Sequence, residues 1–164
     1  MGACPGWRNF DMLQKKKLTS DQALQRAKQF CSYQERSHAE TKEKLYSFGL
    51  FKKDVEKLIS QLVEEDYLNE ERFAAAYARG KFRMNHWGRV KIKYELKQKL
   101  VSEFCIIKAM KEIDENEYEK TLNKLLNEKS EDVKDEKNVY VKKRKIKDYL
   151  LQKGFELDLI LKKL

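Results

Sequence analysis

A basic stretch in the middle of the chain, residues 79–99, holds the side chains best suited to binding a ligand. Its cations are Arg79, Lys81, Arg83, Arg89, Lys91, Lys93, Lys97 and Lys99, and Glu95 is its only acidic residue. Four rings lie between them, namely Phe82, His86, Trp87 and Tyr94. Cations neutralise phosphates, and an exposed ring can stack on an unpaired base. The stretch is therefore typical of a surface that binds a polyanion such as nucleic acid.

A purely structural interpretation of this stretch is also open. Phe82 and Tyr94 would then be core residues, and the cations would only keep a helix face in water. For the two rings this interpretation is favoured. For the cations it is not, because an ordinary solvated helix alternates charges of both signs and acids are nearly absent here.

A second basic run lies toward the C-terminal end of the chain. Its cations are Lys142, Lys143, Arg144 and Lys145, with Lys137 and Lys147 beside them. If both basic segments line one concave side, the protein has a basic groove of its own. Side chains scattered over opposite faces would contradict that hypothesis.

The residue types that catalysis or metal binding needs are not grouped in this sequence. The two histidines, His38 and His86, are far apart, and neither has a cysteine or carboxylate at metal-ligand spacing. A glycine-rich phosphate loop of the G-x-x-x-x-G-K-[ST] type is absent. We therefore expect a protein that is not an enzyme and holds no metal or other cofactor.

The composition indicates a charge-rich, all-helical protein. Lysine and arginine number 36 against 27 aspartates and glutamates, a net charge of +9, which favours polyanionic partners. Of the 164 residues 38% are charged, and Pro5 is the only proline, so the commonest helix breaker is missing from residues 6–164. Glycine is also scarce, with six residues.

Three observations place the chain in a compartment. The three cysteines, Cys4, Cys31 and Cys105, form no short pairing motif, which fits a reducing cytoplasm. No apolar run approaches the roughly 20 residues that span a membrane. The N-terminal residues lack the apolar core of a signal peptide. We expect a cytoplasmic protein that makes no membrane contact, with residues 1–17 as a flexible lead-in.

A pattern of apolar residues occurs three times, at offsets of 51 and 54 residues. It aligns Leu45 with Leu96 and Leu150, and aligned apolar positions that share their offsets indicate a real repeat. The predicted three-helix units span residues 18–68, 69–113 and 114–164. Units this small bury little apolar area each, so neighbours should pack in a row. The predicted fold is all-α, with three tandem, helix-turn-helix-like repeats in an elongated and curved arrangement.

Capping signals place the helices inside these units. Thr19 with Gln22, and Ser37 with Glu40, are capping boxes in the first unit. In the second unit we expect helices over 70–84, 89–99 and 103–112, the last capped by Ser102. In the third, Asp114 begins a helix, residues 127–136 form a longer connection or a frayed helix end, and helices follow over 137–153 and 156–163.

The run from Asp66 to Tyr77, together with residues on either side of it, resembles the RecX family of regulators of the bacterial RecA recombinase. Asn69 suits an N-cap, and Glu70 and Glu71 suit the first turn of a helix. The matching positions are Arg36-Ser37, Lys44-Leu45, Gly49, Tyr67-Leu68-Asn69, Arg72-Phe73-Ala74, Tyr77, Gly88-Arg89, Ile92, Glu95-Leu96 and Lys99. Thr41, in place of the usual leucine, and Leu100, in place of the usual glycine, depart from the family pattern and put local helix geometry in question.

The resemblance implies a non-catalytic protein without a cofactor that lies in the groove of a RecA–single-stranded DNA filament. There it would inhibit ATP hydrolysis and strand exchange and so modulate recombination, DNA repair and the SOS response. The partners would be the RecA filament and single-stranded DNA, contacted directly or through the filament, and a monomer suffices. The twelve cations from Arg79 to Lys99 and from Lys142 to Lys145 would form the contact surface.

Two other functions are compatible with the residues. A helix-turn-helix repressor that reads duplex DNA would form a symmetric dimer and expose polar readers at the start of its recognition helix. The third helices, near residues 52–65 and 103–112, have mixed or acidic ends that suit a major groove poorly. A helical adaptor with an incidental positive charge would affect neither nucleic acid nor recombinase.

Overall fold

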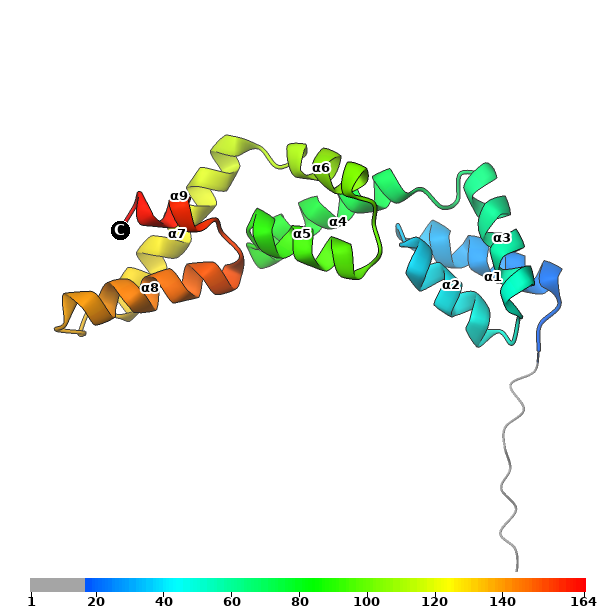
Figure 1. The fold of residues 1–164 in the computed structure, drawn as a ribbon, viewed down its shortest axis with the longest axis horizontal. Helices are drawn as coiled ribbons and strands as arrows, with labels where there is room; N and C mark the ends of the chain where they lie inside the picture. The colour runs from blue at the N-terminus through cyan, green and yellow to red at the C-terminus, as the bar shows by residue number, and fades with distance from the viewer. Residues whose placement is uncertain (1–16) are drawn as a thin grey trace, which may run out of the picture.

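A computed structural model describes residues 17–164, and within this range it contains nine α-helices and no strand. Three groups of three helices follow one another in an elongated, arched body (Figure 1). The first holds α1 (Ser20–Tyr33), α2 (His38–Ser47) and α3 (Lys52–Glu64), and the second holds α4 (Glu70–Asn85), α5 (Arg89–Gln98) and α6 (Glu103–Lys111). The third holds α7 (Glu115–Asp132), α8 (Val139–Lys153) and α9 (Leu157–Leu161). The predicted all-α fold of tandem three-helix repeats is confirmed. The expected N-terminal lead-in falls almost wholly outside the described residues.

Local capping sets most of the helix starts. Both predicted capping boxes form, at the starts of α1 and α2. The side chain of Asn69 accepts a bond of 2.9 Å from the backbone N–H of Arg72, as expected of the N-cap of α4. Ser102 does not cap α6 through its side chain. Its hydroxyl instead donates to Glu70 at 2.7 Å, which fastens α6 to the start of α4.

The third repeat differs from the sequence prediction at residues 127–136. Instead of ending near 126, α7 continues to Asp132, and Asn138 then caps α8 through bonds from the N–H groups of Tyr140 and Val141. The helix continues because Leu126 and Val133 pack against the core and Lys129 pairs with Asp132 along its surface. The connection is therefore shorter than expected.

The buried residues form two separate hydrophobic clusters. One lies within the first repeat and runs from Ala23 to Leu68. The other begins at Phe73 and continues to Ile160, so the second and third repeats share one core. Repeats two and three are thereby joined by apolar packing, whereas the first repeat has a core of its own.

The two departures from the family pattern occupy special positions. Leu100 lies between α5 and α6 in the left-handed backbone region, with φ of 59°, and is 78% exposed. A non-glycine residue is strained there. Because the Leu100 side chain is mostly exposed, packing does not offset the strain. Thr41 is fully buried, and its hydroxyl is satisfied by donating to the carbonyl of Ser37 at 3.0 Å.

Among residues 17–164, no helix combines the length and the apolar character that crossing a membrane requires. Over the same range, no three His, Cys, Asp or Glu side chains gather closely enough to hold a metal ion.

Candidate nucleic-acid interface

The predicted contact residues lie on three helices, α4, α5 and α8. Arg79, Lys81 and Arg83 belong to α4, and the other cations of the middle segment belong to α5 or end it. Figure 1 shows α2, α5 and α8, the second helices of the three repeats, along the same lower edge of the arch. The basic helices α5 and α8 thus follow one side of the body.

Half of the twelve predicted cations form ion pairs inside the protein. The pairs are Arg79–Glu112 at 2.9 Å, Arg83–Glu117 at 4.0 Å, Arg89–Glu115 at 2.6 Å, Lys97–Glu103 at 3.1 Å, Lys99–Glu40 at 2.6 Å and Lys145–Glu136 at 2.8 Å. The carboxylates come from other helices or loops, so a count of acids within residues 79–99 could not reveal them. These six cations therefore make contacts within the protein as well as adding charge.

Arg89 is the most deeply placed of the six, at the junction between the second and third repeats. Its side chain is only 17% exposed and its guanidinium lies 4.2 Å from the centre of the Tyr118 ring. Burial lowers the pKa of Arg89, but the Glu115 carboxylate, together with Tyr118 and Glu156, raises it by more, and the guanidinium remains charged. Arg89 is therefore engaged in the junction.

Tyr118 completes this polar network. Its hydroxyl accepts a bond of 3.0 Å from the backbone N–H of Arg89 and donates one of 2.6 Å to Glu156. Burial, followed by the Glu156 carboxylate, raises the pKa of Tyr118 far above its usual range, so the phenol stays protonated. Its ring packs between Phe82 and Phe155, at centroid distances of 5.7 and 5.0 Å.

The start of α5 meets the end of α8 through the backbone. Gly88 donates to the carbonyl of Lys153 at 2.8 Å, and Val90 donates to that of Gly154 at 3.0 Å. Unpaired N–H groups at one helix start thereby satisfy unpaired carbonyls at another helix end. The start of α5 is therefore joined to the end of α8, and this contact sets the position of one basic helix relative to the other.

Six predicted cations have no carboxylate within 4.0 Å among the described residues: Lys81, Lys91, Lys93, Lys142, Lys143 and Arg144. Two of them are still held in place, since the ammonium groups of Lys81 and Lys91 lie 5.0 and 4.5 Å from the Trp87 ring. Lys93, Lys143 and Arg144 are exposed, and these three are the most available to a ligand.

The aromatic residues divide between core and surface. Phe82 is 4% exposed and belongs to the core, as the structural interpretation predicted. Tyr94 is 60% exposed on α5, beside Lys93, and the same interpretation was wrong for it. An exposed ring is free to stack on an unpaired base.

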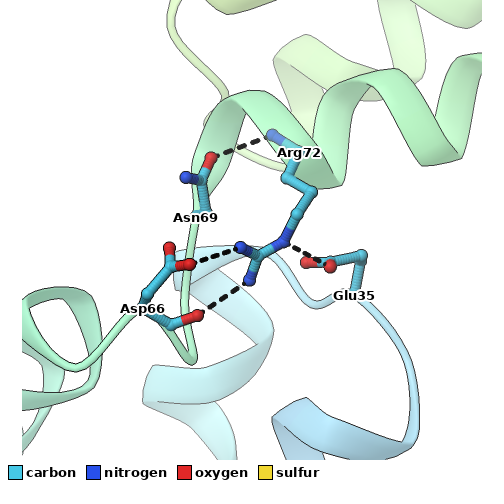
Figure 2. Close-up of polar contacts among 4 residues, drawn as sticks. All are labelled: Glu35, Asp66, Asn69 and Arg72. Atoms are coloured by element: carbon cyan, nitrogen blue, oxygen red, sulfur yellow. Dashed lines mark hydrogen bonds and ion pairs between the residues drawn. The ribbon is translucent and has the colours of Figure 1, made fainter.

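The joint between the first and second repeats is a polar contact centred on Arg72, which the charge analysis of residues 79–99 missed. Figure 2 shows its guanidinium between Glu35 and Asp66. It donates to the Glu35 carboxylate at 2.5 Å, to the Asp66 carboxylate at 3.1 Å and to the Asp66 carbonyl at 2.9 Å. Lys99 adds a second link through Glu40. The sequence signals were the position of Arg72 in the first turn of α4 and its place among the residues that match the family pattern.

Comparisons with known proteins agree with this architecture. Residues 69–110 match the family model of the second three-helix domain of RecX, and residues 116–164 match that of the third. The RecX regulatory protein of Clostridium perfringens is 32% identical over 124 residues, covering 75% of this chain and 58% of the relative. That of Bacillus cytotoxicus is 28% identical over 132 residues, covering 80% and 48% respectively. The chain spans about half the length of these curated relatives.

Two solved structures share the fold. The crystal structure of RecX from Lactobacillus salivarius superposes with a TM-score of 0.78 at 24% identity, covering 88% of this chain and 96% of that one. A second RecX crystal structure gives a TM-score of 0.77 at 22% identity, covering 85% and 68%. At these identities the likeness concerns the fold.

Proposed function

The chain belongs to the RecX family of regulatory proteins, and we propose that it regulates the bacterial RecA recombinase without catalysing a reaction itself. In this proposal the arched body lies in the groove of the RecA–single-stranded DNA filament. Bound there, it slows ATP hydrolysis and strand exchange. It acts in the cytoplasm as a monomer.

The repeat architecture supports a filament as the partner. Each repeat presents its second helix along the same edge of the body (Figure 1). A helical filament offers a similar surface on each successive protomer, so separate repeats can contact separate protomers. Linked contacts of this kind add through effective concentration, and each one can be weak.

The observation that carries the proposal is the set of unpaired cations on two helices of fixed spacing. Lys93 on α5 and Lys143 and Arg144 on α8 are exposed, and the backbone contact at Gly88 fixes α5 against α8. Rigid placement of cations lowers the entropy lost on binding. Tyr94 adds a ring that can stack on an unpaired base of the filament DNA.

The proposal is tested by the single-stranded-DNA-dependent ATPase rate of RecA, titrated with this protein. We expect inhibition at well below one molecule per RecA protomer, and inhibition that weakens as salt is raised. Strand exchange measured in parallel should fall over the same concentration range. Unchanged rates at stoichiometric amounts, with the protein folded and the filament formed, would reject the proposal.

A duplex-reading repressor fits the structure less well. In a helix-turn-helix unit the recognition helix needs polar side chains that reach base edges. The third helix of the middle repeat, α6, instead exposes Phe104 and Ile107, at 64% and 51%. Selective binding of one duplex sequence, with no effect on RecA, would reverse this preference.

A further inference from the structure

A groove at the end of the third repeat, between the start of α8 and the α9 segment, shares Lys143 and Arg144 with the proposed filament surface, but its apolar residues take no part in the filament contacts described above. Its volume is about 660 Å³, and it is lined by Val139, Tyr140, Val141, Lys143, Arg144, Lys147, Leu161 and Leu164. Five of these residues are apolar and three are cations. The groove thus has an apolar floor with positive charge at its rim.

The apolar side chains of this groove are left open to water. Tyr140 is 89% exposed, Val139 65% and Leu161 57%. Leu157, one turn before Leu161 on α9, is also exposed at 49%. The core of the third repeat is closed beneath them by Ile146, Leu150 and Ile160, so these exposed side chains are not part of the buried core. A contiguous exposed apolar patch with a polar rim is typical of a protein-binding surface.

The cations at the rim are not neutralised within the described chain. Lys143, Arg144 and Lys147 have no carboxylate within 4.0 Å among residues 17–164, whereas the neighbouring Lys145 pairs with Glu136 at 2.8 Å. Lys145 is thus paired with a carboxylate and does not line the groove, whereas the other three cations line it and have no such partner in the described part of the chain. An occupant must therefore supply both negative charge and an apolar side chain.

We propose that this groove docks an acidic peptide segment of a protein partner. Aliphatic or aromatic side chains of the segment would enter between Tyr140 and Leu161, and its carboxylates would meet Lys143, Arg144 and Lys147. The aliphatic lining favours a peptide over a nucleic acid, because among the described residues that line the groove a base could stack on Tyr140 alone, while four aliphatic side chains would be left uncovered. This binding goes beyond the proposed filament regulation and needs neither DNA nor RecA.

The test uses a fluorescein-labelled synthetic peptide in which leucines and a phenylalanine recur at helical spacing among aspartates and glutamates. Fluorescence anisotropy is followed as the full chain is added. We expect saturable binding, weakened about tenfold by Leu161→Ser or Tyr140→Ser, since apolar anchors dominate such contacts. The double charge reversal Lys143→Glu with Arg144→Glu should abolish binding. A peptide with asparagine and glutamine in place of its acids should bind poorly.

Matched variants distinguish binding in the groove from non-specific binding elsewhere on the surface. Phe104→Ser removes an apolar side chain on α6 whose exposure is similar to that of Leu161, and Lys93→Glu reverses an exposed cation on α5. Both should bind the peptide as the unchanged protein does, with unaltered circular dichroism in every variant. The assay contains no recombinase, so its failure is distinct from failure of filament regulation.

Three results would overturn the proposal. The first is no saturable binding of the acidic peptide, or equal loss of binding in the α6 and α5 control variants. The second is tighter binding of a thymidine oligonucleotide than of the peptide, with the same dependence on Leu161, which would make the groove a nucleic-acid site. The third is self-association that is lost in Leu161→Ser, which would show that a second copy of the chain covers the groove.

Discussion

Gly88 and Gly154 lie in direct backbone contact, at the point where the second repeat meets the third. A Cβ atom on Gly88 would stand 2.2 Å from the carbonyl oxygen of Gly154, and one on Gly154 would stand 2.2 Å from the Cβ of Lys91. Gly154 also needs its φ of 93°, which other residues rarely adopt. The relative position of α5 and α8, and with it the spacing of their cations, depends on this contact.

Replacing Gly88 by alanine should therefore separate the two helices. The added methyl group meets rigid backbone rather than a flexible side chain, so we expect a loss of about 1–3 kcal/mol in the free energy of unfolding. Urea unfolding followed by circular dichroism measures this loss. The matched control is Gly80→Ala, because a Cβ at Gly80 has no atom within 4 Å. This control lies within α4 and should gain about 0.5–1 kcal/mol. Equal effects of the two substitutions would contradict the close contact.

Replacing Leu100 by glycine should stabilise the protein. Its left-handed backbone strains a leucine, and its side chain is mostly exposed, so little packing is lost. We expect a gain of about 1 kcal/mol in the free energy of unfolding, measured by the same urea titration. Leu100→Ala is the control, since it shortens the side chain but leaves the strain. A gain of the same size in Leu100→Ala would show that the exposed side chain, rather than the backbone, was responsible.

The Arg72 contact should control the angle between the first repeat and the rest of the molecule. Arg72→Ala should change the free energy of unfolding by less than about 1 kcal/mol, because the ion pairs are exposed. The radius of gyration from small-angle X-ray scattering should nevertheless change, since the first repeat has a separate core. Lys108→Ala, which breaks an ion pair with Glu71 inside the second repeat, should leave the scattering unchanged.

Salt gives an independent check of the same joint. At about 1 M salt, charges are screened within roughly 3 Å, and the unchanged protein should scatter as Arg72→Ala does. If neither salt nor the substitution alters the scattering curve, contacts other than Arg72 set the angle between the repeats.

Stability should fall in acid partly because of Glu40. Burial raises the pKa of this carboxyl, but its hydrogen bonds with Lys99 and the Ser37 backbone, together with the charges of Lys99 and Arg36, lower it by more, and the net pKa lies below the ordinary value of 4.5. A depressed folded-state pKa means that the unfolded chain binds the proton first as the pH falls. The stabilisation is therefore present above about pH 4.5 and lost below it.

The measurement is the urea midpoint as a function of pH. Glu40→Gln keeps a side-chain oxygen for the capping box but cannot titrate, so its midpoint should fall less steeply in acid. The control is Glu43→Gln, an exposed position on the same helix without an ion pair among the described residues. If Glu40→Gln loses stability in acid as steeply as the unchanged protein, Glu40 is not a source of the acid sensitivity.

Charge reversal on the two basic helices should weaken filament regulation. We expect Lys93→Glu combined with Lys143→Glu to raise the concentration needed for half-inhibition of the RecA ATPase by about tenfold or more, about 1.4 kcal/mol or more of binding free energy. Both side chains are exposed and lack ion pairs among residues 17–164, so the circular dichroism should not change. The control makes the same charge change on α3, with Lys53→Glu and Lys57→Glu. Equal potency of the two double variants would place the contact elsewhere.

Arg89 is unsuited to such a test, although the sequence groups it with the other cations. Its substitution would remove the Glu115 ion pair and the contact with the Tyr118 ring, and so disturb the junction of two repeats. Loss of activity in an Arg89 variant would report on structure and binding together. Variants at Lys93 and Lys143 report on binding alone, because these side chains make no ion pair among residues 17–164.

The sequence by itself determined the helices, the tandem three-helix repeats and the family. Capping boxes, an N-cap at Asn69 and apolar residues at helical spacing act between residues at most about four positions apart, so they can be recognised along the chain. The same local signals were weak at residues 127–136, where packing of Leu126 and Val133 extended α7 beyond the predicted end.

Only the tertiary structure decided which cations are available. Arg79, Arg83 and Arg89 seemed unopposed because their carboxylate partners, Glu112, Glu117 and Glu115, lie outside residues 79–99. The contact between Gly88 and Gly154 likewise joins two repeats, and nothing in the sequence near either glycine indicates this contact. Long-range ion pairs and backbone contacts depend on how helices pack, and packing depends on the whole chain at once.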